Sequence, residues 1–205
     1  MRVGVLASGE GTNLQALLDG IHGREIEVVA VACDQPSARA LERARAAGVP
    51  SRVFLRSEFG ARSARDAAMG DWLAEQGVEL VVLAGYMAIL DAGFVTRFPD
   101  RILNVHPSLL PAFPGVRAVE QALEHGVKVF GVTVHLVDEG VDTGPIVLQR
   151  AVELPDARDP AAVRASLRPI EHELLPRAVA LMAAGRLRRD AGHPRRVLID
   201  EEPGS

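Results

Sequence analysis

The sequence predicts an α/β protein: a mostly parallel, twisted sheet of about seven strands with helices on both faces. Short apolar runs alternate along the chain with segments whose apolar residues recur at helical spacing. Most of these runs are apolar throughout, as in parallel strands that are buried on both faces. Before and after residues 138–145 two runs are joined only by a short turn, so we expect this last strand pair to be antiparallel.

The first half of the chain is predicted to repeat a strand followed by a helix. A helix is expected to begin near Leu14, and Gly48 and Gly77 stand where two later helices would end, a position that glycine favours. Strands are expected over residues 3–7, 26–33, 51–55 and 78–83, and further helices over 37–48, 62–76 and 91–98.

The second half is predicted to contain strands at 102–106, 127–137 and 146–152, with helices at 118–126 and 159–184. Pro169 and Pro176 fall inside the last helix, so we expect a kink or a break there. A single domain is predicted over residues 1–186, with halves 1–100 and 101–186. Residues 187–205 have little periodicity and are predicted to be a tail, either mobile or strand-like at a sheet edge.

Composition favours an ordinary soluble protein. Of 205 residues, 48% are hydrophobic and 24% charged, and the net charge of −4 indicates neither a nucleic-acid binder nor a membrane-surface protein. No apolar stretch approaches the roughly 20 residues that a membrane helix needs. The N-terminal apolar run is broken at residues 8–11, which argues against a signal peptide, and no clustered Cys and His spacing suggests a metal site. We therefore expect a cytoplasmic protein.

The single cysteine, Cys33, excludes an internal disulfide and fits a reducing compartment. It ends the apolar run Val28-Val29-Ala30-Val31-Ala32. We interpret Cys33 as a small buried residue and not as a nucleophile.

A glycine-rich turn, Ser8-Gly9-Glu10-Gly11-Thr12-Asn13, separates the first predicted strand from the first helix. Helix N-termini present backbone N–H groups and a partial positive charge, which suit a phosphate. The spacing matches neither the G-x-G-x-x-G pattern nor a Walker loop. On the residues alone, a phosphate site and a tight turn with a Thr or Asn helix cap are equally supported.

A second candidate segment, Ala84-Gly85-Tyr86-Met87-Ala88-Ile89-Leu90, follows the most apolar predicted strand. Ligands of parallel sheets bind at the carboxyl ends of the strands. The apolar residues of this loop suit a flat heterocyclic ligand, and they equally suit a place in the core.

The strongest candidate for chemistry is the run Ile102-Leu103-Asn104-Val105-His106. Residues two apart in a strand point to the same face, so Asn104 and His106 would lie side by side. The loop that follows is stiffened by prolines, and one X-Pro bond there could be cis. An isolated Asn-x-His at a strand end is most often only a hydrogen-bonded structural pair, so later parts of the chain have to decide.

Two further polar features occur near the last predicted strand pair. His135 lies within a strand, and we interpret it as a structural histidine and not as a ligand. Asp142 lies in a Gly-rich turn at residues 138–145. That turn is either an ordinary hairpin turn or a device that presents the Asp142 carboxylate to a histidine.

Four motifs together resemble the phosphoribosylglycinamide formyltransferase family of purine synthesis. They are SGEGTNLQALLD, LAGYMAIL, ILNVHPSLLPAFPG and GVTVHLVDEGVDTGPIVLQ, and the resemblance covers roughly residues 1–186. The Asn-x-His and Asp-x-Gly part is similar to a wider group that includes methionyl-tRNA formyltransferase and formyltetrahydrofolate deformylase. The glycine-rich start is what resembles the ribotide-using family in particular.

The resemblance implies a Rossmann-like formyltransferase domain that uses 10-formyltetrahydrofolate as co-substrate and no metal. Residues 1–100 would form a half that binds the ribotide phosphate, and residues 101–186 a catalytic and folate half. The implied partners are small molecules only, glycinamide ribonucleotide and folate, with no nucleic acid and no membrane. The protein would be a monomer or a homodimer.

Individual roles follow from the same resemblance. The catalytic residues would be Asn104, His106 and Asp142, with Asp142 favouring the imidazolium form of His106. Glycinamide ribonucleotide would contact Gly11, Thr12, Asn13 and Glu171. Folate would contact Arg65, Met87, Ala88, Ile89, Leu90, Asn104, Asp138, Glu139, Gly140, Val141 and Asp142.

The chain departs from the family pattern at several positions. Many relatives have Arg where Ala88 stands, and many have His within the stretch that reads Val116-Arg117-Ala118-Val119 here. Pro169 is unusual beside Glu171. An arginine of relatives that contacts folate corresponds to Arg62 or Arg65, of which the resemblance favours Arg65.

Two readings compete with the formyltransferase. Formyltetrahydrofolate deformylase would use the same Asn–His–Asp set with water as acceptor. The chain could also be a non-catalytic folate- or nucleotide-binding domain, although binding alone does not require a general acid.

Overall fold

A computed structural model describes residues 1–200 of the chain. Contacts divide the chain into two compact units, Met1–Asn104 and the residues from Val105 onward. The division falls inside strand β5 (Ile102–His106), between the two polar residues Asn104 and His106.

The first unit contains a parallel sheet in the strand order β3-β2-β1-β4-β5. Every pairing between neighbouring strands in this order is parallel, which confirms the prediction for this half. The core of β1, β2 and β4 consists of Val, Leu and Ala residues that are fully buried, because both faces of a parallel sheet are covered. The strands are β1 (Arg2–Ala7), β2 (Glu27–Cys33), β3 (Ser51–Val53) and β4 (Leu80–Leu83).

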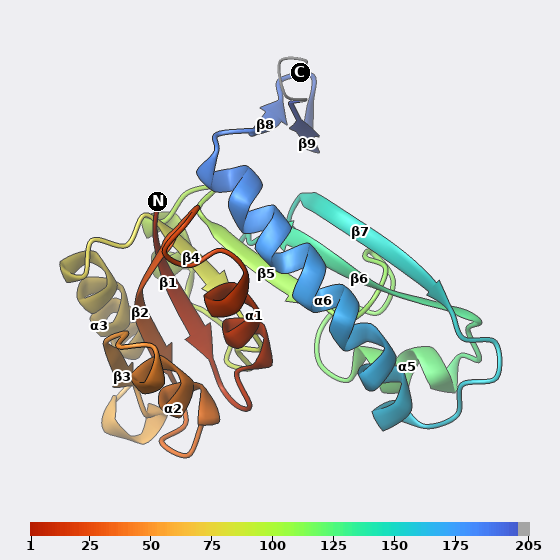
Figure 1. Cartoon of the computed structure of the whole chain (residues 1–205), viewed down its shortest axis with the longest axis horizontal. Helices are drawn as coiled ribbons and strands as arrows, with labels where there is room; N and C mark the ends of the chain where they lie inside the picture. Colours follow the sequence, from red (N-terminus) through yellow and green to blue (C-terminus); the bar gives the residue numbers. More distant parts are fainter. Residues whose placement is uncertain (201–205) are drawn as a thin grey trace. The chain divides into compact units, whose positions relative to one another are not determined.

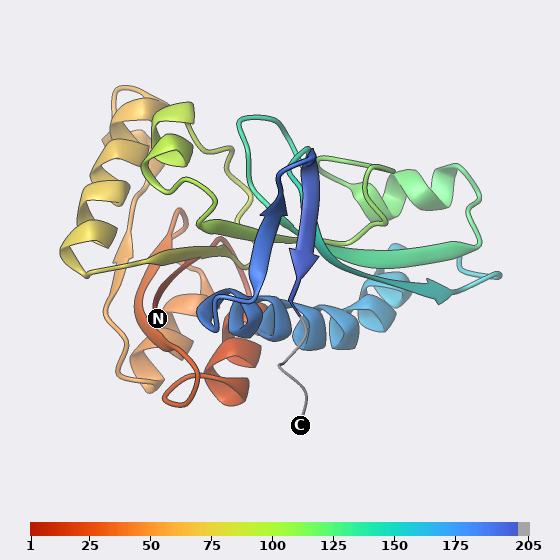
Figure 2. The ribbon, with the colours of Figure 1, turned by 90° about the horizontal axis from the view of Figure 1, so that it is seen from above.

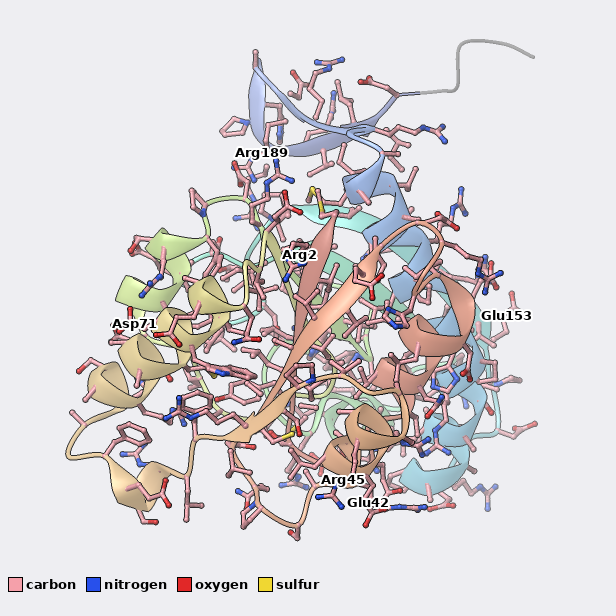
Figure 3. The ribbon with its side chains drawn as sticks, turned by 60° about the vertical axis from the view of Figure 1, so that its left-hand side comes forward. Arg2, Glu42, Arg45, Asp71, Glu153 and Arg189 are labelled. Atoms are coloured by element: carbon pink, nitrogen blue, oxygen red, sulfur yellow. The ribbon has the colours of Figure 1, made fainter. Side chains whose placement is uncertain are left out.

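Helices cover both faces of this sheet, as the sequence predicts. Figure 2 shows α1 and α2 on one side of the strands and α3 and α4 on the other. In α2, Ala40 and Ala44 are buried while Glu42 and Arg45 lie at the periphery (Figure 3), so the helix is amphipathic. The helices are α1 (Thr12–Gly20), α2 (Arg39–Ala46), α3 (Arg62–Glu75) and α4 (Ala92–Arg97), with a short 3₁₀ turn η1 (Arg56–Glu58).

The second unit is built on β6 (Val129–Leu136) and β7 (Ile146–Glu153), which pair antiparallel from Val129–Glu153 to His135–Ile146, as expected. Helix α6 (Pro160–Ala183) packs against both strands, and α5 (Ala118–Glu124) packs against α6. The contacts of α6 with β6, β7 and α5 bury its apolar face, which includes Leu167, Leu174, Leu175 and Val179.

The expected break in the last helix is wrong, because α6 is a continuous helix from Pro160 to Ala183 that contains both prolines (Figure 1). Each proline removes one backbone N–H and therefore one helical hydrogen bond. The leucines buried before and after Pro169 hold the flanking turns on the sheet. Packing of this face therefore outweighs the local preference of proline.

The predicted tail contains two strands, β8 (Leu187–Asp190) and β9 (His193–Ile199), paired as an antiparallel hairpin. Figure 1 shows this hairpin beyond the C-terminal end of α6. Strand β9 also pairs parallel with β7 at Arg196 and Ile146. The strand-like alternative is therefore confirmed up to residue 199, and residues 1–200 hold nine strands where about seven were expected. Residues 201–205 of the predicted tail lie outside the described residues.

Two further expectations can be compared with the structure. Cys33 is buried, as expected, and burial raises the pKa of its thiol to about 12, so the thiol is not a nucleophile. Among residues 1–200, no helix is long and apolar enough to cross a membrane.

Replacing Pro169 by Ala should stabilise the protein. A proline inside a helix lowers the free energy of unfolding by about 3 kcal/mol relative to alanine. Because proline also stiffens the unfolded chain, about 1 kcal/mol of this loss is offset. Because Pro169 is exposed, little packing is lost, and we expect the free energy of unfolding to rise by about 2 kcal/mol in urea denaturation. Pro176 is buried, so Pro176→Ala should gain less. A loss of stability in Pro169→Ala would contradict this account of α6.

Candidate active site

The polar residue at the end of β5, His106, is buried and has an oxygen at each ring nitrogen. Its Nδ1 lies 3.3 Å from Oδ2 of Asp142, and its Nε2 lies 2.8 Å from the carbonyl oxygen of Phe113. A neutral imidazole has a single N–H and can satisfy only one of these acceptors, whereas a protonated ring satisfies both. The surroundings of His106 therefore offer an acceptor to a proton on either ring nitrogen.

The carboxylate of Asp142 contacts three polar groups of the second unit: the rings of His106 and His135 and the N–H of Gly115. The backbone N–H of Gly115 donates to Oδ2 at 2.7 Å, and Nε2 of His135 lies 3.4 Å from Oδ1. Burial would raise the pKa of Asp142, but the hydrogen bond from His135, the N–H of Gly115 and the neighbouring His106 outweigh it and hold the pKa at about 2. The carboxylate is therefore ionised throughout the pH range in which the protein would work.

His135 lies beside Asp142, a position that the sequence analysis did not predict. It is buried, its Nδ1 lies 2.8 Å from the carbonyl oxygen of Leu136, and its other nitrogen faces Asp142. The prediction of a structural histidine agrees with the hydrogen bonding of His135. It did not include the position of His135 beside the Asp142 carboxylate. The sequence position of His135, near the end of β6 and close to the turn that carries Asp142, could have indicated this contact.

The loop between β5 and α5 is held by a compact hydrogen-bond network. Thr133 Oγ1 donates to the carbonyl of Ser108 at 2.7 Å and accepts from the N–H of Leu110 at 3.1 Å. Gln149 Nε2 donates to the carbonyl of Leu110 at 2.8 Å, and Ser108 Oγ donates to the carbonyl of Ala112 at 2.6 Å. The Leu110–Pro111 peptide is cis, as the sequence allowed. This network fixes the loop from which the Phe113 carbonyl faces His106.

Gly131 on β6 is required by the close approach of the same loop. A Cβ built at this position would lie 2.4 Å from Cδ2 of Leu109 and 2.5 Å from the carbonyl oxygen of Arg150. Any side chain there would push Leu109 and its loop away from the sheet.

The turn after β6 places Asp142 through its own internal contacts. Asp138 Oδ1 accepts from the N–H of Gly140 at 3.1 Å and from Thr143 Oγ1 at 2.6 Å. Asp142 itself has a φ of 53°, in the left-handed region that Asp tolerates better than most residues. Glu139, Gly140 and Val141 form the exposed part of this turn.

In the first unit, Gly11 is the N-cap of α1, with a φ of 68°. A Cβ at Gly11 would lie 2.8 Å from Cα of Ala40, so only glycine fits between the turn and α2. Thr12 and Asn13 are the first residues of the helix, and no side chain at the cap position bonds its N–H groups. The N-cap position is therefore occupied by Gly11 and not by Thr12 or Asn13, and the choice between a tight turn and a phosphate site stays a prediction.

The loop after β4 exposes apolar side chains. Met87 is 68% exposed and Ile89 is 60% exposed, so assigning these two residues to the core is wrong. Their backbone is held in place, since Ser8 Oγ accepts from the N–H of Met87 at 2.8 Å and Asp66 Oδ2 accepts from the N–H of Asp91 at 2.7 Å. Exposed apolar side chains on a hydrogen-bonded loop are typical of a ligand-binding surface, so the loop 87–90 fits a flat apolar ligand.

Arg62 and Arg65 both line a cavity of the first unit beside Ala88 and Ile89. Arg65 is only 2% exposed, and its guanidinium pairs with Asp66 at 2.7 Å and approaches the carbonyl oxygen of Ile89 at 3.4 Å. Arg62, at the start of α3, is exposed. Both arginines therefore line the cavity, Arg65 buried beneath the loop and Arg62 exposed at the start of α3.

The remaining predicted residues have simple surroundings. Glu171 lies half-buried on α6 in the second unit, next to His172. Asn104 is half-buried on β5, two residues before His106 and on the same face of the strand. Among residues 1–200 there is no group of His, Cys, Asp and Glu side chains that could hold a metal ion.

Known proteins are similar to this chain over most of its length. The family model described as formyl transferase matches residues 1–179. Phosphoribosylglycinamide formyltransferase of Haemophilus influenzae is 41% identical over 189 residues, covering 91% of this chain and 89% of the relative. The crystal structure of glycinamide ribonucleotide transformylase 1 from Symbiobacterium toebii superposes with a TM-score of 0.93 at 49% identity, covering 98% of this chain and 94% of that one. The chain belongs to the formyl transferase family.

A third relative is much longer than this chain. The trifunctional purine biosynthetic protein adenosine-3 of Drosophila pseudoobscura pseudoobscura is 45% identical over 192 residues, which cover 92% of this chain but only 14% of the relative. The similarity therefore concerns one part of that protein. Family membership implies a folate-derived co-substrate and small-molecule substrates.

The stability contributed by Asp142 should depend on pH. The pKa of its carboxyl is lowered on folding from 3.8 to about 2, so the ionised group stabilises the fold above pH 4 and this stabilisation is lost as the pH falls toward 2. The stability difference between wild type and Asp142→Asn, measured by urea denaturation, should therefore shrink by about 1 to 2 kcal/mol as the pH is lowered below about 4.

Asp156 provides the matched control, because it is exposed in a turn of the same unit. Asp156→Asn, measured in the same series, is the reference for replacing an exposed carboxylate in this unit. A pH-independent difference for Asp142→Asn would mean that Asp142 gains no net stabilisation from the two histidines and Gly115.

Proposed function

We propose that the chain transfers the formyl group of 10-formyltetrahydrofolate to the amine of glycinamide ribonucleotide, yielding the N-formyl product and tetrahydrofolate in de novo purine (IMP) biosynthesis. The observation that carries the proposal is the buried His106 held between Asp142 and the Phe113 carbonyl, in a chain of the formyl transferase family. The names of relatives that match over about nine tenths or more of both chains support the ribotide as acceptor.

In the proposed reaction the substrate amine attacks the formyl carbon and a tetrahedral oxyanion forms. Asn104 and protonated His106 would donate hydrogen bonds to this oxygen, and each such donor is typically worth about 3 kcal/mol. A charged oxygen is a stronger acceptor than a neutral carbonyl, so it would compete with Phe113 for Nε2 of His106. His106 would then act as general acid toward the leaving folate nitrogen, directly or through water, and the proton lost by the attacking amine would restore the protonated His106.

The ionised Asp142 would hold the positive charge on His106 before the reaction starts. His135 shares the same carboxylate and orients it from the other side. This division of roles needs no covalent intermediate and no metal, because an amine attacks a formyl group directly.

Substrate contacts are proposed for each unit separately. In the first unit, the N–H groups that follow Gly11, with Thr12 and Asn13, would hold the ribotide phosphate. The exposed apolar residues of the loop 87–90 would contact the pterin ring, with Ala88 offering only its backbone. We propose Arg62 as the folate contact in place of Arg65, whose guanidinium is paired with Asp66. In the second unit, residues 138–142 would contact folate and Glu171 the ribotide.

Several wider features belong to the same proposal. Residues 1–186 would act as one formyltransferase domain with a phosphate-binding half, 1–100, and a catalytic and folate half, 101–186. The protein would work in the cytoplasm, as a monomer or a homodimer, without nucleic-acid or membrane partners. Deformylase activity is the weaker alternative, because the relatives described above are ribotide formyltransferases. The His106–Asp142–His135 cluster argues against a purely binding domain.

His106→Ala should lower kcat by at least about 100-fold, because it removes an oxyanion donor and the general acid together. The assay follows the absorbance change as a 10-formylfolate loses its formyl group, with and without glycinamide ribonucleotide. His193→Ala, at an exposed position on β9, is the control and should retain full activity. Turnover by the wild type without the ribotide would favour the deformylase, and an unchanged rate in His106→Ala would refute the proposed mechanism.

A further inference from the structure

The C-terminal hairpin contacts the turn that carries Asp142. Arg195, on β9, donates from Nη2 to the carbonyl oxygen of Thr143 at 2.8 Å. Thr143 is the residue directly after Asp142. The parallel pairing of β9 with β7 through Arg196 and Ile146 places the hairpin beside the end of this turn.

We propose that Arg195 is a positioning residue for formyl transfer, which holds the Asp142 turn so that its carboxylate meets both His106 and His135. The inference rests on the proposed role of Asp142. It gives a function to β8 and β9, which neither the sequence motifs nor the proposed substrate contacts use.

Outside the Asp142 carboxylate, which meets Gly115, His106 and His135, the hydrogen bonds that shape this turn are local. Asp138 bonds to Gly140 and Thr143 within the same turn, and the N–H of Leu136 bonds to the carbonyl of Pro145 at its base. These contacts shape the turn but come from the turn and the strand ends that it joins. Arg195 adds a contact from a separate element, a hairpin that is itself fixed to β7.

The geometry around Asp142 leaves little tolerance for movement. Its two oxygens lie 3.3 Å and 3.4 Å from the ring nitrogens of His106 and His135, near the long end of hydrogen-bonding distances. A displacement of the turn by about 1 Å would break one of these interactions, and displacements of this size are costly in catalysis. A cationic donor at the next peptide group restrains just this movement.

Arg196 is a control supplied by the chain itself. Successive residues of a strand point to opposite faces, so Arg195 and Arg196 differ in direction while sharing a strand and a charge. Arg196 approaches Asp190 of its own hairpin, with Nη1 3.5 Å from Oδ2, and not the turn. Its removal tests the effect of charge and hairpin stability without loss of the Thr143 contact.

The experiment compares steady-state kinetics and thermal stability of Arg195→Ala, Arg195→Lys and Arg196→Ala in the full chain. We expect Arg195→Ala to lower kcat roughly three- to tenfold with an unchanged KM for the ribotide and an unchanged melting temperature. Arg195→Lys, which keeps a cationic donor, should recover most of this loss, and Arg196→Ala should behave as wild type. An unchanged kcat in Arg195→Ala, or an equal loss in Arg196→Ala, would overturn the inference.

A double variant separates this inference from the proposed function. If Arg195 acts through Asp142, then Arg195→Ala should cause no further loss of kcat in the Asp142→Asn background, since residues that act as a unit are not additive. An additive loss would show that Arg195 acts elsewhere. If Asp142→Asn alone kept full activity, the proposed role of Asp142 would fail, whatever the result for Arg195.

Discussion

The carboxylate of Asp142 is the interaction on which the active site depends. Its two oxygens face two histidines and one backbone N–H, which belong to β5, β6 and the loop before α5. A carboxylate has room for several donors, so one residue can fix all three segments. Burial raises the pKa of Asp142, but these donors together lower it to about 2.

Each element of the second unit contributes to placing this group. The antiparallel pair of β6 and β7 sets the ends of the turn that carries Asp142, and α6 covers the pair although two prolines interrupt its hydrogen bonding. Thr133 and Gln149 on the same strands hold the loop that presents the Phe113 carbonyl to His106. The site is therefore supported by backbone contacts as much as by its titratable side chains.

Local sequence pattern was sufficient for most of the fold and for the motif residues. Buried apolar runs located the strands, and the order of the motifs indicated the family. Three structural features could not be predicted from local sequence pattern. Strands β8 and β9 are mostly exposed and lack periodicity, α6 is kept continuous by packing, and His135 meets Asp142 only through the register of β6 and β7. Each depends on contacts between distant residues, which no short segment encodes.

The central claim is that Asp142 pairs with both His106 and His135 through the ring nitrogens that face its carboxylate. The most direct measurement is an NMR spectrum of ¹⁵N-histidine-labelled protein, compared with that of Asp142→Asn. The account predicts N–H protons on Nδ1 of His106 and on Nε2 of His135, both shifted downfield by the carboxylate and both lost or shifted back in the variant. An Nδ1 of His106 that carries no proton in the wild type, or signals that are the same in Asp142→Asn, would contradict it.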